Sequence, residues 1–332
     1  MKPIFIVGMG LAGACTAWHL WRRGIPFQVF DSGRPGSSQV AAGLIHPVTG
    51  KNCAVAEDFA IRRAHALQFY QSCQRDLDCI FWHELEVVRL LDRADFTKKS
   101  HKFSQGAAAS WVKEILHDSS WHDQVSVILR GGARVDVPMF LSATKDFFRA
   151  RGLMIQEEIR TPFADAITVF CEGSQGLIRG NPIPWKHRCA RGEILTVYAA
   201  SWRQKRMVTG QGWLVPVGQD CYKIGATYEW DEWDRGPTEA GRKRLMEMAR
   251  FLGGENFDVI THEVGVRPIL RKSQPVVGRI ADGVYVLNGL GSKGSLYAPW
   301  AAEQLVTCMV NGAPLDSFLS VDEYFASLNK HS

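Results

Sequence analysis

The chain has 332 residues, of which 46% are hydrophobic and 22% charged, and its formal net charge is +5 at pH 7. This length favours two domains over a single core, and the mild positive charge suits an anionic cofactor or substrate but does not by itself indicate a nucleic-acid-binding protein. The eight cysteines lack metal-ligand spacing, and we find no run of about 18 uncharged apolar residues and no secretory leader, so we expect a cytoplasmic protein without a metal or a membrane span.

The first predicted element is a nucleotide-binding turn between a strand and a helix. Residues 4–7 form a short apolar run, typical of a strand buried on both faces. Gly8, Gly10 and Gly13 follow with the spacing G-x-G-x-x-G, which permits a tight turn, close approach of a pyrophosphate and close packing of the helix. A second strand ends at Asp31, 18 residues after Gly13, where a carboxylate would accept hydrogen bonds from a ribose. The pattern therefore predicts a dinucleotide site; glycines that serve only helix packing are the alternative.

The middle of the chain is predicted to mix helices and strands. Apolar periodicity predicts helices over 57–75, 138–151 and 238–252. Strands are expected at 85–91, 125–130, 167–171, 194–198, 207–209, 213–217 and 222–226. The polar stretch 92–110, with a basic run at 98–102, is expected to be a loop.

The strand-rich part of the chain is interrupted and then resumes. This arrangement predicts a cofactor domain built from three segments around an inserted substrate domain. We assign 1–75, 135–180 and 261–332 to the first domain, and 76–134 and 181–260 to the second.

A second glycine-rich loop lies near the C-terminus. Gly289, Gly291 and Gly294 stand in a bare loop that is followed directly by an apolar helix pattern. Such a loop presents unpaired backbone N–H groups at the positive end of a helix, and Lys293 adds a full positive charge there. Because the two glycine loops are about 280 residues apart, we expect one long cofactor to be held by both ends of the chain.

Several blocks occur in the same order as in a known family. The chain resembles the superfamily of FAD enzymes that contains D-amino-acid oxidase and glycine oxidase. The matching blocks are GMGLAGACTAWHL with Asp31, AAGLI at 41–45, VFCEGSQG at 169–176, RGEIL at 191–195, WLVPVG at 213–218, IGATYE at 224–229, GVRPILRKSQPVVG at 265–278, and LNGLGSKGSLYAP at 287–299. In the RGEIL block, Glu193 stands where the family has glutamine.

This resemblance implies an α/β fold, in which a Rossmann-like FAD-binding domain of the glutathione-reductase type carries an inserted substrate domain with an antiparallel sheet. It implies non-covalent FAD, because no cysteine or histidine stands in a block where the family attaches the flavin. The expected cofactor-binding residues are Gly8, Gly10, Leu11, Ala12, Gly13, Asp31, Ser32, Ala42, Gly43, Leu44, Ile45, Gly173, Gly289, Gly291, Ser292, Lys293, Gly294 and Ser295.

The same resemblance places the substrate. Arg267 is the expected carboxylate clamp, since a planar guanidinium binds a carboxylate with two hydrogen bonds. Lys293 and the N–H groups beside it are expected to stabilise negative charge on the reduced flavin. Tyr228 and His46 are further candidates for substrate contact. The alternatives are an ion-paired Arg267, a solvated Lys293, a core Tyr228 and a structural His46.

The final loop, G-L-G-S-K-G, is similar to that in the oxidase domain of a bifunctional enzyme that modifies the wobble uridine of tRNA. Three functions therefore remain open. The favoured one is oxidation of the C–N bond of an amino acid or small secondary amine, with O2 or another electron acceptor. Removal of a carboxymethyl group from a tRNA uridine is the less favoured one. A flavin-binding protein without turnover is the third.

Overall fold

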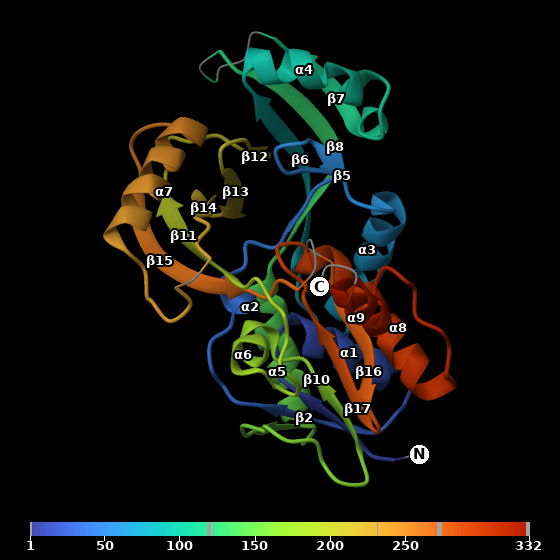
Figure 1. The fold of residues 1–332 in the computed structure, drawn as a ribbon. Helices are drawn as coiled ribbons and strands as arrows, with labels where there is room; N and C mark the ends of the chain where they lie inside the picture. Colours follow the sequence, from blue (N-terminus) through green and yellow to red (C-terminus); the bar gives the residue numbers. More distant parts are fainter. Residues whose placement is uncertain (1, 118–120, 122, 231, 271–273, 330–332) are drawn as a thin grey trace.

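The computed structural model describes residues 2–117, 121, 123–230, 232–270 and 274–329 (Figure 1). It contains two large sheets, one in the lower and one in the upper half of the view in Figure 1. Segments near both ends of the chain lie in the lower half of this view. This agrees with the expectation that the two glycine loops, one near each end, lie close together.

The smaller sheet has the strand order β16-β17-β10-β1-β2-β9. All its neighbouring strands are parallel except β16 and β17, which are antiparallel. Its strands are β1 (Ile4–Val7), β2 (Phe27–Asp31), β9 (Met154–Gln156), β10 (Ile167–Phe170), β16 (Val276–Ala281) and β17 (Val284–Asn288). The apolar runs predicted as strands at 4–7 and 167–171 thus lie side by side at its centre, where both faces of the sheet are covered.

The larger sheet has the order β15-β11-β14-β13-β12-β6-β8-β3, and β7 pairs with β8. It is antiparallel except where β12 pairs with β6. Its strands are β3 (Leu44–Ile45), β6 (Trp82–Leu91), β7 (Val112–Leu116), β8 (Val125–Val135), β11 (Ala190–Tyr198), β12 (Met207–Thr209), β13 (Trp213–Gly218), β14 (Cys221–Gly225) and β15 (Asp258–Arg267). The predicted inserted antiparallel sheet is therefore present. The domain boundaries that we assigned stay a prediction.

Helices cover both sheets, and a separate two-stranded ribbon lies between β3 and α3 along the chain. The helices are α1 (Leu11–Arg22), α2 (Ser37–Val40), α3 (Phe59–Leu77), α4 (Arg93–Ser104), α5 (Val137–Arg149), α6 (Gly173–Arg179), α7 (Glu239–Leu252), α8 (Gly294–Asn311) and α9 (Val321–Asn329), with a short 3₁₀ turn at Ala109–Trp111. The ribbon is β4 (Val48–Thr49) with β5 (Ala54–Val55). The helices predicted over 57–75, 138–151 and 238–252 correspond to α3, α5 and α7.

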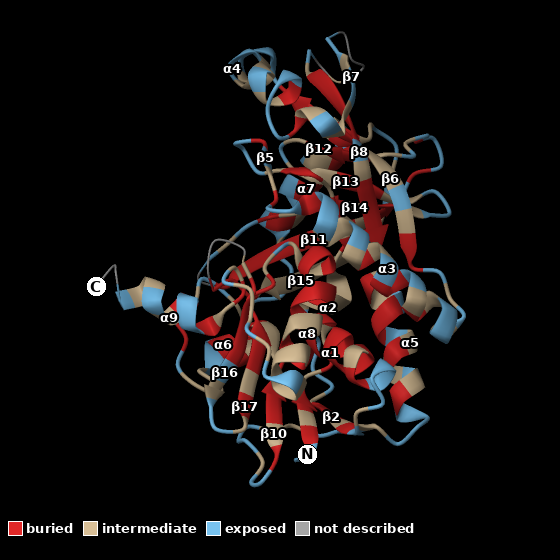
Figure 2. Ribbon diagram, turned by 90° about the vertical axis from the view of Figure 1, so that its right-hand side faces the viewer, coloured by how far each residue is buried: buried red, intermediate tan, exposed pale blue. Residues whose placement is uncertain are grey.

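The largest apolar core packs the smaller sheet and the ends of β6 and β8 against α1, α3, α5 and α8, and α1 is coloured largely as buried in Figure 2. A separate core lies between the larger sheet and α7, around Leu195, Ile224 and Leu245. The cavity described below is lined by residues of both sheets, among them Val7 of β1 and Ile194 of β11.

The prediction of a loop over 92–110 is wrong, because the first part of this stretch is the helix α4. The Asp92 side chain caps the helix by accepting a hydrogen bond from the Asp95 backbone N–H at 2.6 Å. An ion pair of 2.7 Å joins Lys99 to Asp95 one turn earlier, and the rings of Phe96 and Phe103 stack with centroids 6.3 Å apart. The polarity of the stretch conceals a capped helix, in which Phe103 is the buried residue.

Candidate functional site

The structure brings the two glycine loops together around one cavity of about 560 Å³. Each loop opens a helix, and the two helices, α1 and α8, pack against each other. His19 of α1 lies 2.9 Å from the carbonyl oxygen of Pro299, and Arg23 donates a 2.9 Å hydrogen bond to Thr307. Because α1 and α8 begin at the same end of this pair, both positive helix ends point to the same space.

The N-terminal turn is shaped to accept a phosphate. Gly8 has φ +98°, and a Cβ atom at Gly13 would lie only 1.9 Å from the Gly8 carbonyl oxygen, so the helix begins directly against the turn. The first turn of α1 carries no acidic side chain. The Leu11 N–H donates to the Ser38 hydroxyl at 3.3 Å. The Leu11 N–H is therefore engaged, but the other N–H groups of the first turn have no acceptor within the helix and can bind an anion.

Asp31 lies at the end of β2 beside this turn and is only 8% exposed. One carboxylate oxygen accepts a hydrogen bond from the Met9 N–H at 3.1 Å, and the other from the Lys145 ammonium at 2.8 Å. These contacts fix the carboxylate toward the cavity and leave each oxygen a further lone pair for a ribose hydroxyl. Sequence reasoning missed Lys145, because the pairing joins residues 114 positions apart.

The C-terminal loop forms the opposite wall of the cavity. Gly289 and Gly291 have φ +75° and +54°, in the left-handed region that favours glycine. The Asn288 side chain accepts from the Gly289 N–H at 2.8 Å and donates to the Gly173 carbonyl at 3.0 Å, so it ties this loop to the start of α6. Lys293 directly precedes α8, and burial lowers its pKa from the usual range. The wall is therefore positive both from the helix end and from the lysine.

Nearly all the predicted cofactor-binding residues line this cavity: Gly8, Gly10, Leu11, Ala12, Asp31, Ser32, Ala42, Gly43, Leu44, Ile45, Gly173, Gly291, Ser292, Lys293, Gly294 and Ser295. Gly13 and Gly289 do not line it; a Cβ atom at Gly13 would meet the Gly8 carbonyl, and Gly289 has a positive φ, so both contribute to the shape of the turns. The predicted substrate residues Arg267, Tyr228 and His46 line the same cavity.

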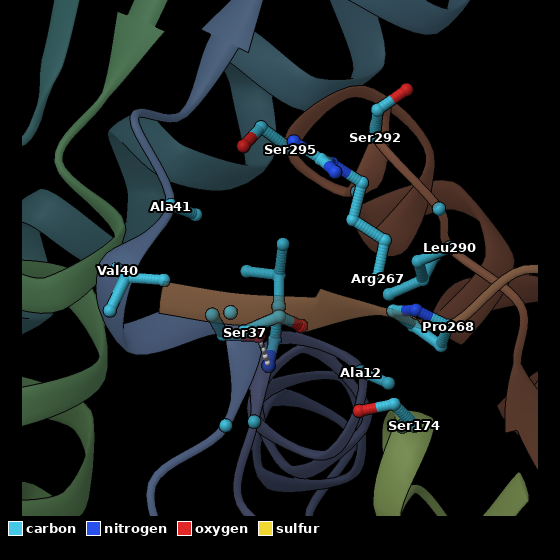
Figure 3. A pocket seen from close by; sticks show the side chains of 18 of the residues that line it. Ala12, Ser37, Val40, Ala41, Ser174, Arg267, Pro268, Leu290, Ser292 and Ser295 are labelled. Carbon is cyan, nitrogen blue, oxygen red and sulfur yellow. Dashed lines mark hydrogen bonds between the residues drawn. The ribbon is translucent and has the colours of Figure 1, made fainter. Parts of the chain in front are cut away.

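Arg267 ends β15 and extends into the cavity toward Ser292 of the C-terminal loop and Ser295 at the start of α8 (Figure 3). Its guanidinium carbon lies 4.8 Å from the centre of the Tyr228 ring, and Nη1 donates a long 3.5 Å hydrogen bond to the Thr227 carbonyl. Among the described residues, no carboxylate lies within 4.0 Å of it. The structure therefore gives no support to an ion-paired Arg267, and its charge is available to an anion in the cavity.

Gly192 makes room for this guanidinium. A Cβ atom at position 192 would lie 2.4 Å from one terminal nitrogen of Arg267 and 2.5 Å from the other. Tyr228 is 44% exposed, so it is not the core tyrosine of our alternative reading. Gly192 leaves the space that the guanidinium of Arg267 occupies, and the ring of Tyr228 packs against it. Together they hold the charge of Arg267 in the cavity.

His46 stands beside the C-terminal loop. Its Nδ1 lies 2.8 Å from the carbonyl oxygen of Val48, which can only accept, so Nδ1 carries the proton and Nε2 is the acceptor. The pKa of His46 is lowered to about 4, chiefly by burial and to a smaller extent by the positive charges of Arg89 and Lys293, although the hydrogen bond to Val48 acts in the opposite direction. The ring is consequently neutral at ordinary pH.

The pH dependence of activity should reflect this neutrality. Since the pKa of His46 is about 4 rather than its usual 6.5, the ring gains a proton only as the pH falls toward 4, and no ionisation of His46 should appear between pH 5 and 8. We expect the profiles of kcat/KM for the wild type and His46→Gln to keep the same shape over that range. An ionisation near pH 6.5 that disappears in His46→Gln would contradict the neutral assignment.

The residues that line the cavity fit FAD. The two unobstructed helix ends suit its pyrophosphate and the edge of its ring, and the Asp31 carboxylate suits its adenosine ribose. Cys171 also lines the cavity, but burial raises the pKa of its thiol to about 12. A protonated thiol is a poor nucleophile, which argues against a thioether bond to the flavin there.

Acid or heat denaturation of the purified protein should release the flavin into the supernatant with the mass of intact FAD. This follows from the protonated Cys171 and from the Nδ1–H of His46, which is held by a backbone carbonyl. Mass spectrometry of the supernatant and of the precipitate checks the result. Flavin mass retained on a peptide after denaturation would refute non-covalent binding.

No group of three or more histidine, cysteine, aspartate or glutamate side chains suited to a metal ion occurs in the part of the chain that the structure describes. In the same described ranges, no helix has both the length and the apolar character needed to cross a membrane.

Comparisons with known proteins identify the family and the fold of the chain. The family model described as DAO, FAD dependent oxidoreductase, matches residues 3–307. Two similar curated proteins are named tRNA 5-methylaminomethyl-2-thiouridine biosynthesis bifunctional protein MnmC. The one from Idiomarina loihiensis is 23% identical over 94% of this chain and 56% of its own length. The one from Marinobacter nauticus is 24% identical over 91% of this chain and 54% of its own length. The chain thus spans about half the length of these relatives.

Two solved structures share the fold. Iminodiacetate oxidase from Chelativorans sp. BNC1 has a TM-score of 0.79 at 19% identity and covers 94% of this chain and 96% of its own. Glycine oxidase from Bacillus cereus has a TM-score of 0.81 at 16% identity and covers 95% of this chain and 96% of its own. The predicted FAD-binding α/β fold is confirmed, and since the family model covers most of the chain, this protein belongs to the DAO family of FAD-dependent oxidoreductases.

Proposed function

We propose that the protein oxidises the C–N bond of a small amine that carries a carboxylate, such as an amino acid or an N-substituted glycine. The observation that carries this proposal is Arg267, a largely buried guanidinium that faces the cofactor cavity and has no carboxylate partner among the described residues. A buried charge of this kind is stabilised when a ligand brings the opposite charge. The structural similarity to glycine oxidase and iminodiacetate oxidase supports the same substrate chemistry.

In this proposal the guanidinium of Arg267 binds the substrate carboxylate through two hydrogen bonds, and Tyr228 holds the guanidinium from its other face. Nε2 of neutral His46 accepts a hydrogen bond from the substrate amine, which must itself be neutral to react. Bound FAD supplies a two-electron acceptor. The α-carbon loses hydrogen with its electron pair, the nitrogen lone pair forms the C=N bond, and water then hydrolyses the iminium product.

Lys293→Met should lower the reduction potential of the bound flavin by about 30 mV, which corresponds to about 1.4 kcal/mol for a two-electron couple. The ammonium of Lys293 stands before α8 without an ion-pair partner among the described residues, so its charge is available to the negative charge that reduction adds. Methionine keeps the length and removes the charge. Reductive titration against a reference dye measures the potential.

Lys51→Met is the matched control for Lys293→Met, because Lys51 lines the same cavity but is exposed to solvent. Its charge is screened, and the potential should stay at the wild-type value. Equal potentials in all three proteins would mean that Lys293 is solvated, as in our alternative reading, and that the end of α8 acts alone.

Anaerobic bleaching of the flavin tests the proposed function. Glycine, sarcosine, other N-substituted glycines including iminodiacetate, proline and D-amino acids are mixed with the holoenzyme, and loss of the absorbance near 450 nm reports reduction. We expect at least one of these amines to bleach the flavin, and its methyl ester, which lacks the carboxylate, to fail. Bleaching by none of them, or equal rates with acid and ester, would refute a carboxylate-bearing amine as substrate. Subsequent admission of O2 then tells whether O2 is the electron acceptor.

A second candidate function is oxidation of a carboxymethylaminomethyl group on a tRNA uridine, as the name of the MnmC relatives prompts. One observation favours it. The exposed rings of Tyr228 and Trp230 lie 4.8 Å apart, and the guanidinium carbon of Arg188 lies 4.5 Å from the centre of the Trp230 ring. Exposed aromatic rings beside a cationic side chain suit stacking on a nucleobase.

Purified tRNA from cells that accumulate the carboxymethylaminomethyl nucleoside separates the two functions. If tRNA is the substrate, it should bleach the flavin at concentrations far below those needed for free amines, and Trp230→Ala should weaken this effect. Bleaching by free amines alone would favour the first function. A flavin that neither substrate reduces would point to the third reading, a flavin-binding protein without turnover.

A further inference from the structure

Arg89 is a second buried arginine that lines the cavity, and the proposed function gives it no role. Arg89 lies on β6 within the otherwise apolar run VVRLL at 87–91. It is 8% exposed and lines the same cavity as Arg267. Sequence reasoning passed over it, although a lone charge inside an apolar strand is an available signal.

The hydrogen bonds of Arg89 are incomplete. Within the described part of the chain, its side chain makes one hydrogen bond, from Nη2 to the Gly50 carbonyl oxygen at 2.9 Å, and its buried Nε has no partner. No carboxylate of the described residues lies within 4.0 Å of the guanidinium. A buried donor without a partner costs free energy, so it needs an explanation.

The other two buried arginines of the described chain are paired. Arg134, 6% exposed, lies 3.1 Å from the carboxylate of Asp136. Arg191, fully buried, forms ion pairs with Glu193 at 2.8 Å and with Glu229. Where this protein buries an arginine for structure, it therefore supplies a carboxylate. Arg89 and Arg267 depart from that pattern, and both line the cavity.

Arg89 and Arg267 enter the cavity from different parts of the larger sheet. In the order β15-β11-β14-β13-β12-β6, the strands of Arg267 and Arg89 are separated by four others. Arg89 stands opposite Thr209 in the pairing of β6 with β12, and its hydrogen bond to Gly50 joins it to the loop that follows His46. Its positive charge acts on His46 together with that of Lys293. Arg267 and Arg89 can thus bind two anionic groups of one ligand at separate points of the cavity, and His46 lies near Arg89.

We propose that Arg89 binds a second carboxylate of the substrate, and that the preferred substrates are secondary amines with a carboxylate on each nitrogen substituent. This inference rests on the proposed function for the oxidation itself. Arg267 then binds the carboxylate next to the carbon that is oxidised, and Arg89 binds the one on the other substituent. Each guanidinium has the free donors that such a carboxylate needs.

Ligand binding to the oxidised holoenzyme tests this proposal without turnover. Thiodiglycolate and (methylthio)acetate replace the amine nitrogen by sulfur and differ in the second carboxylate. Their Kd values follow from the change that each causes in the visible spectrum of the flavin. In the wild type we expect thiodiglycolate to bind at least about tenfold more tightly. In Arg89→Gln the two Kd values should become similar, with (methylthio)acetate bound as in the wild type.

Lys51→Gln is the matched control, because it removes one positive charge from the exposed rim of the same cavity. It should keep the wild-type ratio of the two Kd values. FAD content and reduction potential, measured for each variant, should not change in Arg89→Gln. A loss of FAD or a shifted potential there would assign Arg89 to the cofactor and overturn the proposal.

The Kd values of thiodiglycolate and (methylthio)acetate for the wild-type holoenzyme test the proposal even without a variant. If the native holoenzyme binds both thioethers equally well, the second carboxylate has no site and the proposal is wrong, whether or not Arg89→Gln folds. Failure of the proposed function looks different: no amine would then bleach the flavin, while the preference for thiodiglycolate could still be measured. Arg89→Gln could instead weaken tRNA binding and leave thiodiglycolate binding unchanged. That result would assign Arg89 to a tRNA phosphate and would overturn the proposal of a second carboxylate site.

Discussion

Arg267→Ala should lower kcat/KM for any carboxylated amine that the enzyme oxidises by about 30- to 4,000-fold, which corresponds to about 2–5 kcal/mol of transition-state stabilisation. The guanidinium is largely buried against Tyr228 and has no carboxylate partner among the described residues, so its loss leaves the substrate carboxylate unpaired in the cavity. Steady-state kinetics with the best substrate of the bleaching screen measure the change. An unchanged kcat/KM would remove Arg267 from the substrate site.

Three further variants show whether the effect comes from the guanidinium itself. Arg267→Lys keeps the charge but loses the two-pronged geometry, so it should recover little activity. Gly192→Ala keeps Arg267 but places a methyl group where its terminal nitrogens now lie, which should displace them and raise KM. Arg188→Ala removes an exposed guanidinium from Trp230, at the other end of the same aromatic pair, and should leave the kinetics with small amines unchanged.

Asp31→Ala should weaken FAD binding by about 1.5–3 kcal/mol, the usual contribution of hydrogen bonds to a charged acceptor. In the structure this carboxylate accepts from the Met9 N–H and from Lys145, and it faces the cavity beside the phosphate-binding turn. Its removal deprives the ribose of an acceptor and leaves the ammonium of Lys145 without its partner. The Kd of FAD, measured by fluorescence after removal and re-addition of the cofactor, reports the loss.

Asp146→Ala is the matched control for Asp31→Ala, because Asp146 is an exposed carboxylate that pairs with Arg149 at 2.8 Å on the surface of α5. Its ion pair contributes little, and FAD affinity should not change. Asp31→Asn keeps the shape and an acceptor oxygen but loses the charge, so its Kd should lie between those of the wild type and Asp31→Ala. If Asp31→Ala keeps the wild-type affinity for FAD, the Asp31 carboxylate serves only to bind Met9 and Lys145 and does not contact the cofactor.

The sequence by itself determined the parts of the site that depend on local backbone geometry. Gly8 and Gly13 are required by a positive φ and by a 1.9 Å approach to backbone, and such demands leave a fixed spacing in the chain. Asp31 follows the same logic, since it directly ends the strand beside the turn. Lys293 is fixed to the start of its helix. Each could be predicted because the structure involved spans only a few residues.

Only the tertiary structure decided which charges are paired. Arg89, Arg191 and Arg267 look alike in the sequence, but Arg191 lies between two glutamates, whereas no carboxylate of the described residues lies within 4.0 Å of either of the others. The contact of Lys145 with Asp31 could not be predicted from the sequence either. These differences arise from the pairing of distant strands and helices, which brings together residues whose separation along the chain carries no regular pattern. The local sequence determines the shape of the cofactor turns, and long-range packing determines which charges remain available to a ligand.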